Sequence, residues 1–192
     1  MITYNGIELG PLLEEDRKLL QAIILMTDPK NVIEFGFLRG HSTRTMLEVL
    51  SPNAMLTSYD NTSVSNIPDD KRFTLKRIGQ EEYGGHENVD FVFLDASHDF
   101  ELNKETFKRL LPTLTENAII AVHDTGKWFA NVFEFELGYE HEGGWLHCPD
   151  ERKFMNWIKE EYPQWQQIHF NTQSKISHGI TLLQQYNKLS HA

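Results

Sequence analysis

The sequence contains one cysteine, few basic residues relative to acidic ones, and no long apolar run. Cys148 alone cannot form an internal disulfide or a multi-cysteine zinc site, and an unpaired thiol is typical of a reducing compartment. Eighteen basic and 28 acidic residues give a formal net charge of −10, which repels polyphosphate at long range and argues against nucleic acid as a partner. The apolar runs are far shorter than the ~20 residues that cross a bilayer. We therefore expect a cytoplasmic chain without a signal peptide or a membrane partner.

A length of 192 residues, with 40% hydrophobic and 24% charged residues, suits one globular domain over 1–192. Apolar spacing and capping signals predict helices over 11–27, 40–50, 101–114, 127–137 and 150–162, and strands over 31–35, 54–59, 73–78, 89–94, 118–122, 165–170 and 180–186. Strands and helices alternate up to residue 126, which indicates a parallel α/β sheet, whereas the last two strands favour an antiparallel hairpin. The predicted parts are an N-terminal helix (1–28), a core (31–126), an aromatic-rich cover (127–163) and a C-terminal hairpin (164–187).

The first strand runs into a turn that carries an acid and two glycines, Glu34-Phe-Gly36-Phe-Leu-Arg-Gly40-His-Ser42-Thr43. Open α/β sheets bind ligands at this kind of turn, where Ser42 and Thr43 could cap the free N–H groups of the next helix or bond to a bound carboxylate. The dinucleotide fingerprint has glycine where this chain has Glu34. An acid there repels a pyrophosphate and attracts an ammonium or sulfonium group, which indicates S-adenosylmethionine rather than NAD. The structural alternative is a tight turn without a ligand.

A second acid, Asp60, ends the second strand 26 residues after Glu34. This spacing leaves room for one helix and one strand between the two acids. At the tip of a second strand, a carboxylate is positioned to accept hydrogen bonds from both hydroxyls of a ribose. The alternative is a surface acid that caps a loop.

Four titratable residues follow the fourth and fifth strands: Asp95, His98, His123 and Asp124. We expect them to converge because the carboxyl ends of neighbouring parallel strands meet at one edge of a sheet. Such groups can bind a divalent cation, or a histidine oriented by a carboxylate can remove a proton from a hydroxyl. Taken one at a time, each is equally well explained as a helix cap or a hydrogen-bonded loop residue.

With these motifs the chain resembles the class I S-adenosylmethionine-dependent methyltransferases. It is most similar to the O-methyltransferases that act on antibiotic sugars and to the related cephalosporin-hydroxylase-type proteins. Residues 32–43, 59–60, 89–98 and 119–125 carry the resemblance. It implies a Rossmann-like, seven-stranded, mostly parallel sheet with helices on both faces and an antiparallel C-terminal strand. It also implies a small-molecule acceptor, methylated on a hydroxyl.

The resemblance also assigns roles to residues. Glu34, Gly36 and Ser42 would line the methionine part of the cofactor, Asp60 would hold the ribose, and Gln80 would lie near the adenine. The full set of predicted cofactor contacts is Glu34, Gly36, Gly40, Ser42, Thr43, Asp60, Gln80 and Asp95. His98 would be the general base, acting with Asp95 and Asp124 as the predicted catalytic set.

The metal-dependent relatives hold Mg²⁺ through residues that match Asp95, His123 and Asp124. The chain departs from them at His123, where an acid is usual. Imidazole is a poor ligand for Mg²⁺ and a better one for Mn²⁺, Fe²⁺ or Zn²⁺. Either the metal is different or the site works without one. A second departure is Leu38, where many class I members carry glycine.

Other interpretations remain open from the sequence. The aromatic residues after position 127 could form a lid over the acceptor or pack on the core or on a second subunit, so a homo-oligomer is also open. His141, His147 and Cys148 match no standard zinc pattern. His123 leaves room for a non-catalytic cofactor-binding or assembly protein, and Glu34 argues against a nicotinamide oxidoreductase.

Overall fold

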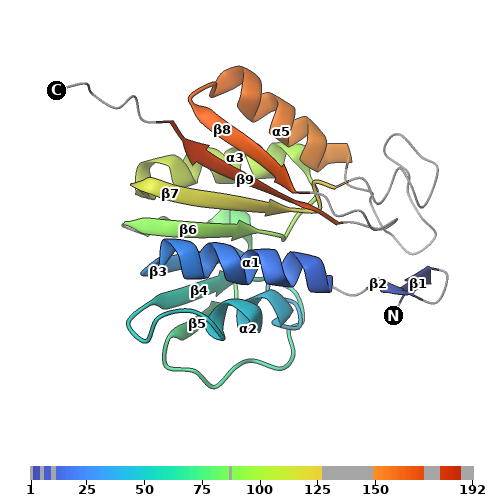
Figure 1. Ribbon diagram of the computed structural model, residues 1–192, viewed down its shortest axis with the longest axis vertical. Coiled ribbons are helices and arrows are strands. Elements are labelled where there is room, and N and C mark those ends of the chain that lie inside the picture. Colours follow the sequence, from blue (N-terminus) through green and yellow to red (C-terminus); the bar gives the residue numbers. More distant parts are fainter. Residues whose placement is uncertain are drawn as a thin grey trace.

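Seven strands form one sheet in the order β5-β4-β3-β6-β7-β9-β8 in the computed structural model, which describes residues 2–4, 7–9, 12–86, 88–126, 149–170 and 178–186 (Figure 1). Neighbours from β5 to β7 pair in parallel, and β9 pairs antiparallel with both β7 and β8. This confirms the predicted fold class and the predicted hairpin. The strands are β3 (Asn31–Phe35), β4 (Met55–Tyr59), β5 (Phe73–Lys76), β6 (Val89–Leu94), β7 (Leu114–His123), β8 (Trp165–Phe170) and β9 (Ile180–Gln185).

Helices cover both faces of this sheet. α1 (Glu14–Thr27) and α2 (His41–Leu47) lie on one face, and α3 (Phe100–Leu110) and α5 (Pro149–Glu161) lie on the other (Figure 1). Two short 3-10 turns, η1 (Gln80–Glu82) and η2 (Leu111–Thr113), connect strands and helices. No helix in the described ranges is long and apolar enough to cross a membrane.

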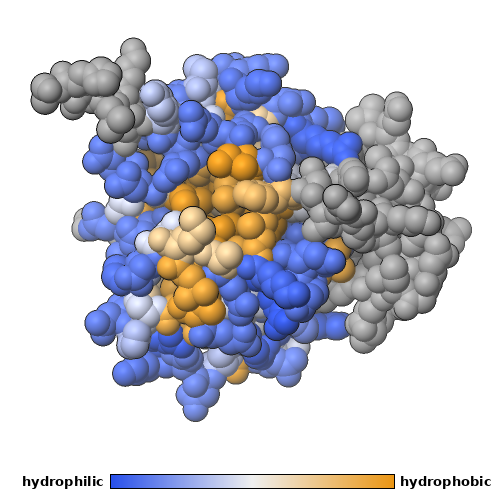
Figure 2. Space-filling view, in the orientation of Figure 1, coloured by the Kyte–Doolittle hydropathy of each residue, from blue (hydrophilic) through white to orange (hydrophobic). Residues whose placement is uncertain are grey.

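The two faces of the sheet have separate apolar cores. Along β6, Phe91 and Phe93 pack with the core under α1 and α2, whereas Val92 and Leu94 pack with the core under α3 and α5. This alternation explains why β6 is apolar from Phe91 to Leu94, since a strand covered on both sides needs apolar residues at successive positions. Asp90, near the start of β6, is only partly buried and accepts hydrogen bonds from the backbone N–H groups of Lys30 and Asn31. On the side of α1, an apolar area also reaches the molecular surface, over α1 and the strands next to it (Figure 2).

Some boundaries differ from the prediction. β7 begins at Leu114 rather than at residue 118, because Leu114 pairs with Val89 although the intervening Thr-Glu-Asn lacks strand patterning. α1 begins at Glu14 instead of residue 11, and a two-stranded hairpin that was not predicted, β1 (Ile2–Tyr4) with β2 (Ile7–Leu9), precedes it. The predicted helix over 127–137, the aromatic cover up to residue 148, and His141, His147 and Cys148 lie outside the described residues.

Candidate active site

The Glu34 carboxyl group lies at the base of the glycine turn and is completely buried. The hydroxyls of Ser42 and Thr43 each donate to it at 2.5 Å, and the Ser58 hydroxyl donates as well. Burial raises the pKa of Glu34 to about 7, although these three hydrogen bonds act in the opposite direction. Ser42 and Thr43 therefore do not cap α2, whose N-cap residue is Gly40 without a side-chain cap.

Gly36 lies where the ends of β3 and β6 come closest. Its φ is +97°, and a Cβ atom added there would lie 2.2 Å from the carbonyl oxygen of Asp95. The sheet itself therefore requires glycine at this position, whatever the turn binds. Leu38 has a φ of +45°, in the region that glycine adopts most easily, at the position where the sequence departs from many class I members.

Replacing Gly36 with alanine is expected to lower the free energy of unfolding by ~2 kcal/mol or more, because both the positive φ and the backbone contact oppose a side chain. Urea unfolding measures the change. The matched control is Gly84→Ala, since an added Cβ at that exposed position meets nothing within 4 Å. Equal stability of the two variants would contradict the prediction.

The Asp60 carboxylate ties the end of β4 to the glycine turn. One oxygen accepts from the backbone N–H groups of Phe37 (2.9 Å) and Leu38 (2.7 Å), and the other from the N–H (2.7 Å) and hydroxyl (2.5 Å) of Thr62. Burial raises its pKa, but these hydrogen bonds outweigh burial and hold the pKa below its usual value. Three of the four donors are backbone groups, so a ribose hydroxyl can most easily replace the Thr62 hydroxyl.

Gln80 begins η1 and faces α3. Its amide nitrogen donates to the side chains of Asn103 (3.0 Å) and Thr106 (2.9 Å), and only 4% of the residue is exposed. The side chain thus holds η1 against α3. Its predicted place near an adenine stays a prediction.

His98 is paired with Glu151 of α5. Its Nδ1 donates to Oε1 of Glu151 at 2.5 Å, and its Nε2 lies 3.9 Å from Oδ2 of Asp124. Burial lowers the pKa of His98, but the Glu151 hydrogen bond and the charges of Glu151, Asp124 and Asp95 outweigh burial and raise the pKa to about 9. The ring is therefore an imidazolium at neutral pH.

His123 lies among three carboxyl groups and is 2% exposed. Its Nδ1 lies 3.0 Å from Oδ1 of Asp95 and 3.6 Å from Oδ1 of Asp124, and its Nε2 lies 3.4 Å from Oδ2 of Asp16. Burial lowers its pKa, but the Asp95 and Asp124 charges and hydrogen bonds to Asp16 and Asp95 raise it well above its usual value. The ring of His178 lies beside it, with centroids 5.3 Å apart.

The predicted residues Asp95, His98, His123 and Asp124 thus meet at the carboxyl edge of β6 and β7. The sequence interpretation missed three residues that join them: Asp16 of α1, Glu151 of α5, and His178, which precedes β9. A signal existed for two of these. Asp16 shares a helical face with Leu20, Ile23 and Ile24, and Glu151 with Phe154, Met155 and Ile158, so each is an acid on the apolar face of an amphipathic helix.

The predicted metal set of Asp95, His123 and Asp124 offers three ligand atoms within 4.8 Å of one another. It does not fit Mg²⁺, which takes oxygen ligands in a near-ideal octahedron. Here an imidazole replaces one oxygen ligand, and its Nδ1 is hydrogen-bonded to Asp95, another member of the set.

Comparison with known proteins bears on the family and the fold of the chain. A family model described as a methyltransferase domain matches residues 33–125, from the glycine turn to the end of β7. No curated protein matches the sequence. The resemblance to the class I methyltransferases is confirmed by this match and by the fold of the solved structures.

Three solved structures illustrate the likeness. A Klebsiella pneumoniae protein provisionally described as an O-methyltransferase has a TM-score of 0.70 at 18% identity, over 95% of this chain and 84% of its own. The O-methyltransferase from Bacillus cereus, in complex with S-adenosylhomocysteine, has a TM-score of 0.66 at 18% identity, over 91% and 82%. The O-methyltransferase TomG from Streptomyces achromogenes, involved in tomaymycin synthesis and bound to S-adenosylmethionine, has 0.62 at 14%, over 92% and 82%.

Proposed function

We propose that the chain methylates a hydroxyl of a small molecule with S-adenosylmethionine, because a methyltransferase-domain model matches residues 33–125 and the sheet has the fold of solved O-methyltransferases. The observation that carries this proposal is the part-buried His98–Glu151 pair at the same sheet edge as the Glu34–Gly36 turn and Asp60. The O-methyltransferases among the similar structures support oxygen as the acceptor atom. We further propose that the protein acts in the cytoplasm.

The turn suits the cofactor chemically. Asp60 stays ionised because backbone N–H groups and Thr62 hold its carboxylate, and an ionised carboxylate is the acceptor that a ribose diol requires. Glu34 supplies a carboxyl group at the base of the turn that we propose to hold the methionine part of the cofactor. When bound, S-adenosylmethionine would supply an electrophilic methyl group on a sulfonium.

His98 is the proposed general base. A hydroxyl must lose its proton as it is methylated, and His98 can accept that proton only as a neutral imidazole. With a pKa of about 9, roughly 1% of the ring is neutral at pH 7. Glu151 would compensate for this low fraction by stabilising the imidazolium that forms when the proton is taken up, as the carboxylate of a catalytic triad does.

Calorimetric titration tests the cofactor assignment. We expect S-adenosylhomocysteine to bind with a Kd in the micromolar range, roughly −8 kcal/mol, and NAD to give no signal. Absence of S-adenosylhomocysteine binding would contradict the proposed function. Tight binding without turnover of any hydroxyl-bearing acceptor would instead favour a non-catalytic cofactor-binding protein.

A further inference from the structure

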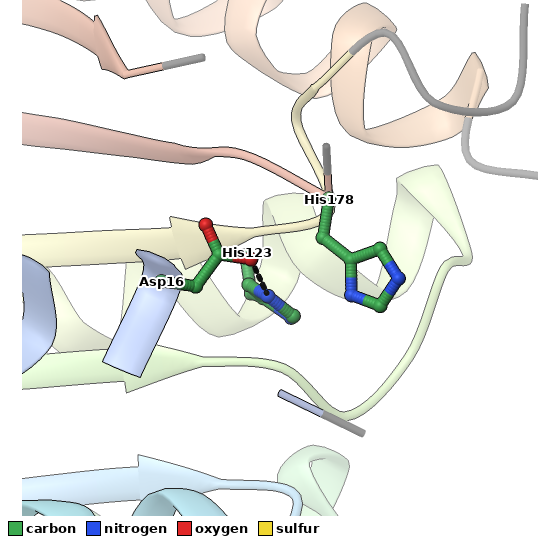
Figure 3. Close-up of side chains that lie close together, drawn as sticks. All are labelled: Asp16, His123 and His178. Carbon is green, nitrogen blue, oxygen red and sulfur yellow. Dashed lines mark hydrogen bonds and ion pairs between the residues drawn. The ribbon is translucent and has the colours of Figure 1, made fainter. Parts of the chain in front are cut away.

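Three residues from distant parts of the chain lie side by side, with His123 between Asp16 and His178 (Figure 3). Asp16 comes from the first turn of α1, His123 from the end of β7, and His178 from the segment that leads into β9 (Figure 3). Their exposed fractions are 3%, 2% and 5%. One ligand atom of each lies within 4.8 Å of the others, a grouping that can hold a metal ion.

We propose that Asp16, His123 and His178 bind a divalent transition-metal ion, with Zn²⁺ as the best fit. Two imidazoles and one carboxylate form a donor set that zinc proteins use, and three protein ligands leave one tetrahedral position for a fourth donor. The set shares only His123 with the Asp95–His123–Asp124 set, and it uses the opposite ring nitrogen.

The distance between Asp16 and His123 supports coordination. Oδ2 of Asp16 lies 3.4 Å from Nε2 of His123, which is long for a charge-assisted hydrogen bond. Two ligand atoms that are each ~2.0–2.1 Å from a tetrahedral zinc lie ~3.3 Å apart. The observed separation therefore matches two ligands of one ion better than a donor and its acceptor.

Asp95 would act as a positioning residue that orients the ring of His123 toward the metal. Nδ1 of His123 lies 3.0 Å from Oδ1 of Asp95, and a neutral ring that donates to Asp95 from Nδ1 has its lone pair on Nε2, the nitrogen nearer Asp16. Metal-bound histidines usually donate their second ring nitrogen to a carboxylate or carbonyl in this way.

Carboxyl groups surround the His123 ring. Asp16, Asp95 and Asp124 each have an oxygen 3.0–3.6 Å from one of its ring nitrogens. A divalent cation brings more positive charge into such a buried cluster than a single proton does, and so compensates it better.

Metal analysis of the purified protein tests the proposal. We expect about one Zn²⁺ per chain in the wild type and in the control His41→Gln, which changes an exposed histidine, and at least tenfold less in Asp16→Asn and His178→Gln. Replacement by Co²⁺ should give the visible absorption of a tetrahedral site in the first two proteins only. Absence of metal after growth and dialysis with Zn²⁺, or equal metal in all four proteins, would overturn the proposal.

A buried substitution could lower stability by itself, so a second test compares the Tm of each protein with and without a metal chelator. Dipicolinate should lower the Tm of the wild type and of His41→Gln but leave that of Asp16→Asn unchanged, because only the first two have metal to lose. An unchanged wild-type Tm would overturn the site and leave His123 as a buried imidazolium. Neither measurement involves methyl transfer, so the result is separate from that of the S-adenosylhomocysteine titration.

Discussion

Replacing His98 with alanine is expected to lower turnover by ~100-fold or more and to leave the affinity for S-adenosylhomocysteine unchanged. His98 is the proposed base for the acceptor hydroxyl, whereas the proposed cofactor contacts lie on the glycine turn and at Asp60. Steady-state kinetics at saturating cofactor, together with calorimetry of both proteins, separates the two effects. Unchanged turnover would remove His98 from the mechanism, and a parallel loss of cofactor affinity would indicate a structural role instead.

The pH profile distinguishes a base from a residue that only maintains the structure. For the wild type we expect kcat/KM to rise about tenfold per pH unit and to level off near pH 9, because the neutral form of His98 increases until its pKa is reached. Glu151→Gln removes the negative charge that helps to raise this pKa, although its amide oxygen can still accept from Nδ1, so the inflection should move to lower pH. A purely structural role for Glu151 would lower the rate at every pH without moving the inflection.

Replacing Asp60 with alanine is expected to weaken S-adenosylhomocysteine binding by ~10- to 100-fold. A hydrogen bond to this charged acceptor from a ribose hydroxyl that replaces the Thr62 hydroxyl is worth roughly 1.5–3 kcal/mol, and every 1.4 kcal/mol is a factor of ten in Kd. Calorimetric titration of the variant against the wild type measures the loss. Unchanged affinity would exclude Asp60 from the cofactor site.

The Asp60 carboxylate also ties down the backbone at Phe37 and Leu38, so alanine could act by loosening the turn. Asp60→Asn separates the two causes, because an amide oxygen can still accept from these N–H groups while the charge is gone. We expect this variant to keep the wild-type Tm more nearly than Asp60→Ala and still to bind S-adenosylhomocysteine weakly. Thr62→Val serves as a matched control, since it removes only the hydroxyl that a ribose would replace, and its affinity should change by a few-fold at most.

The fold was predictable because its signals are local. The apolar run Phe91–Leu94 of β6 indicates burial on both faces, and the short polar connection before β9 indicates an antiparallel return. The start of β7 was not predictable, because Thr115, Glu116 and Asn117 become part of a strand only through pairing with a neighbour.

The part of the site that lies at the ends of β6 and β7 was predictable from the sequence. Asp95, His98, His123 and Asp124 follow directly from the rule that parallel strands end at one edge. Glu151 did not follow, because its contact with His98 depends on how α5 packs across the sheet. The sequence alone, without Glu151, predicts an ordinary histidine that titrates near neutrality, whereas in the structure the pKa of His98 is about 9.

The cluster around His123 is completed by His178, which precedes β9 and is synthesised long after the glycine turn. Because β9 runs against β7, its first residues, and not its last, lie beside the end of β7, where Ile180 pairs with His123. During synthesis, the glycine turn and Asp60 can therefore come together while His178 is still inside the ribosome. Contacts between residues so far apart in the chain form late in folding. A nascent chain is thus expected to acquire a cofactor-binding turn before His123 has its full set of neighbours.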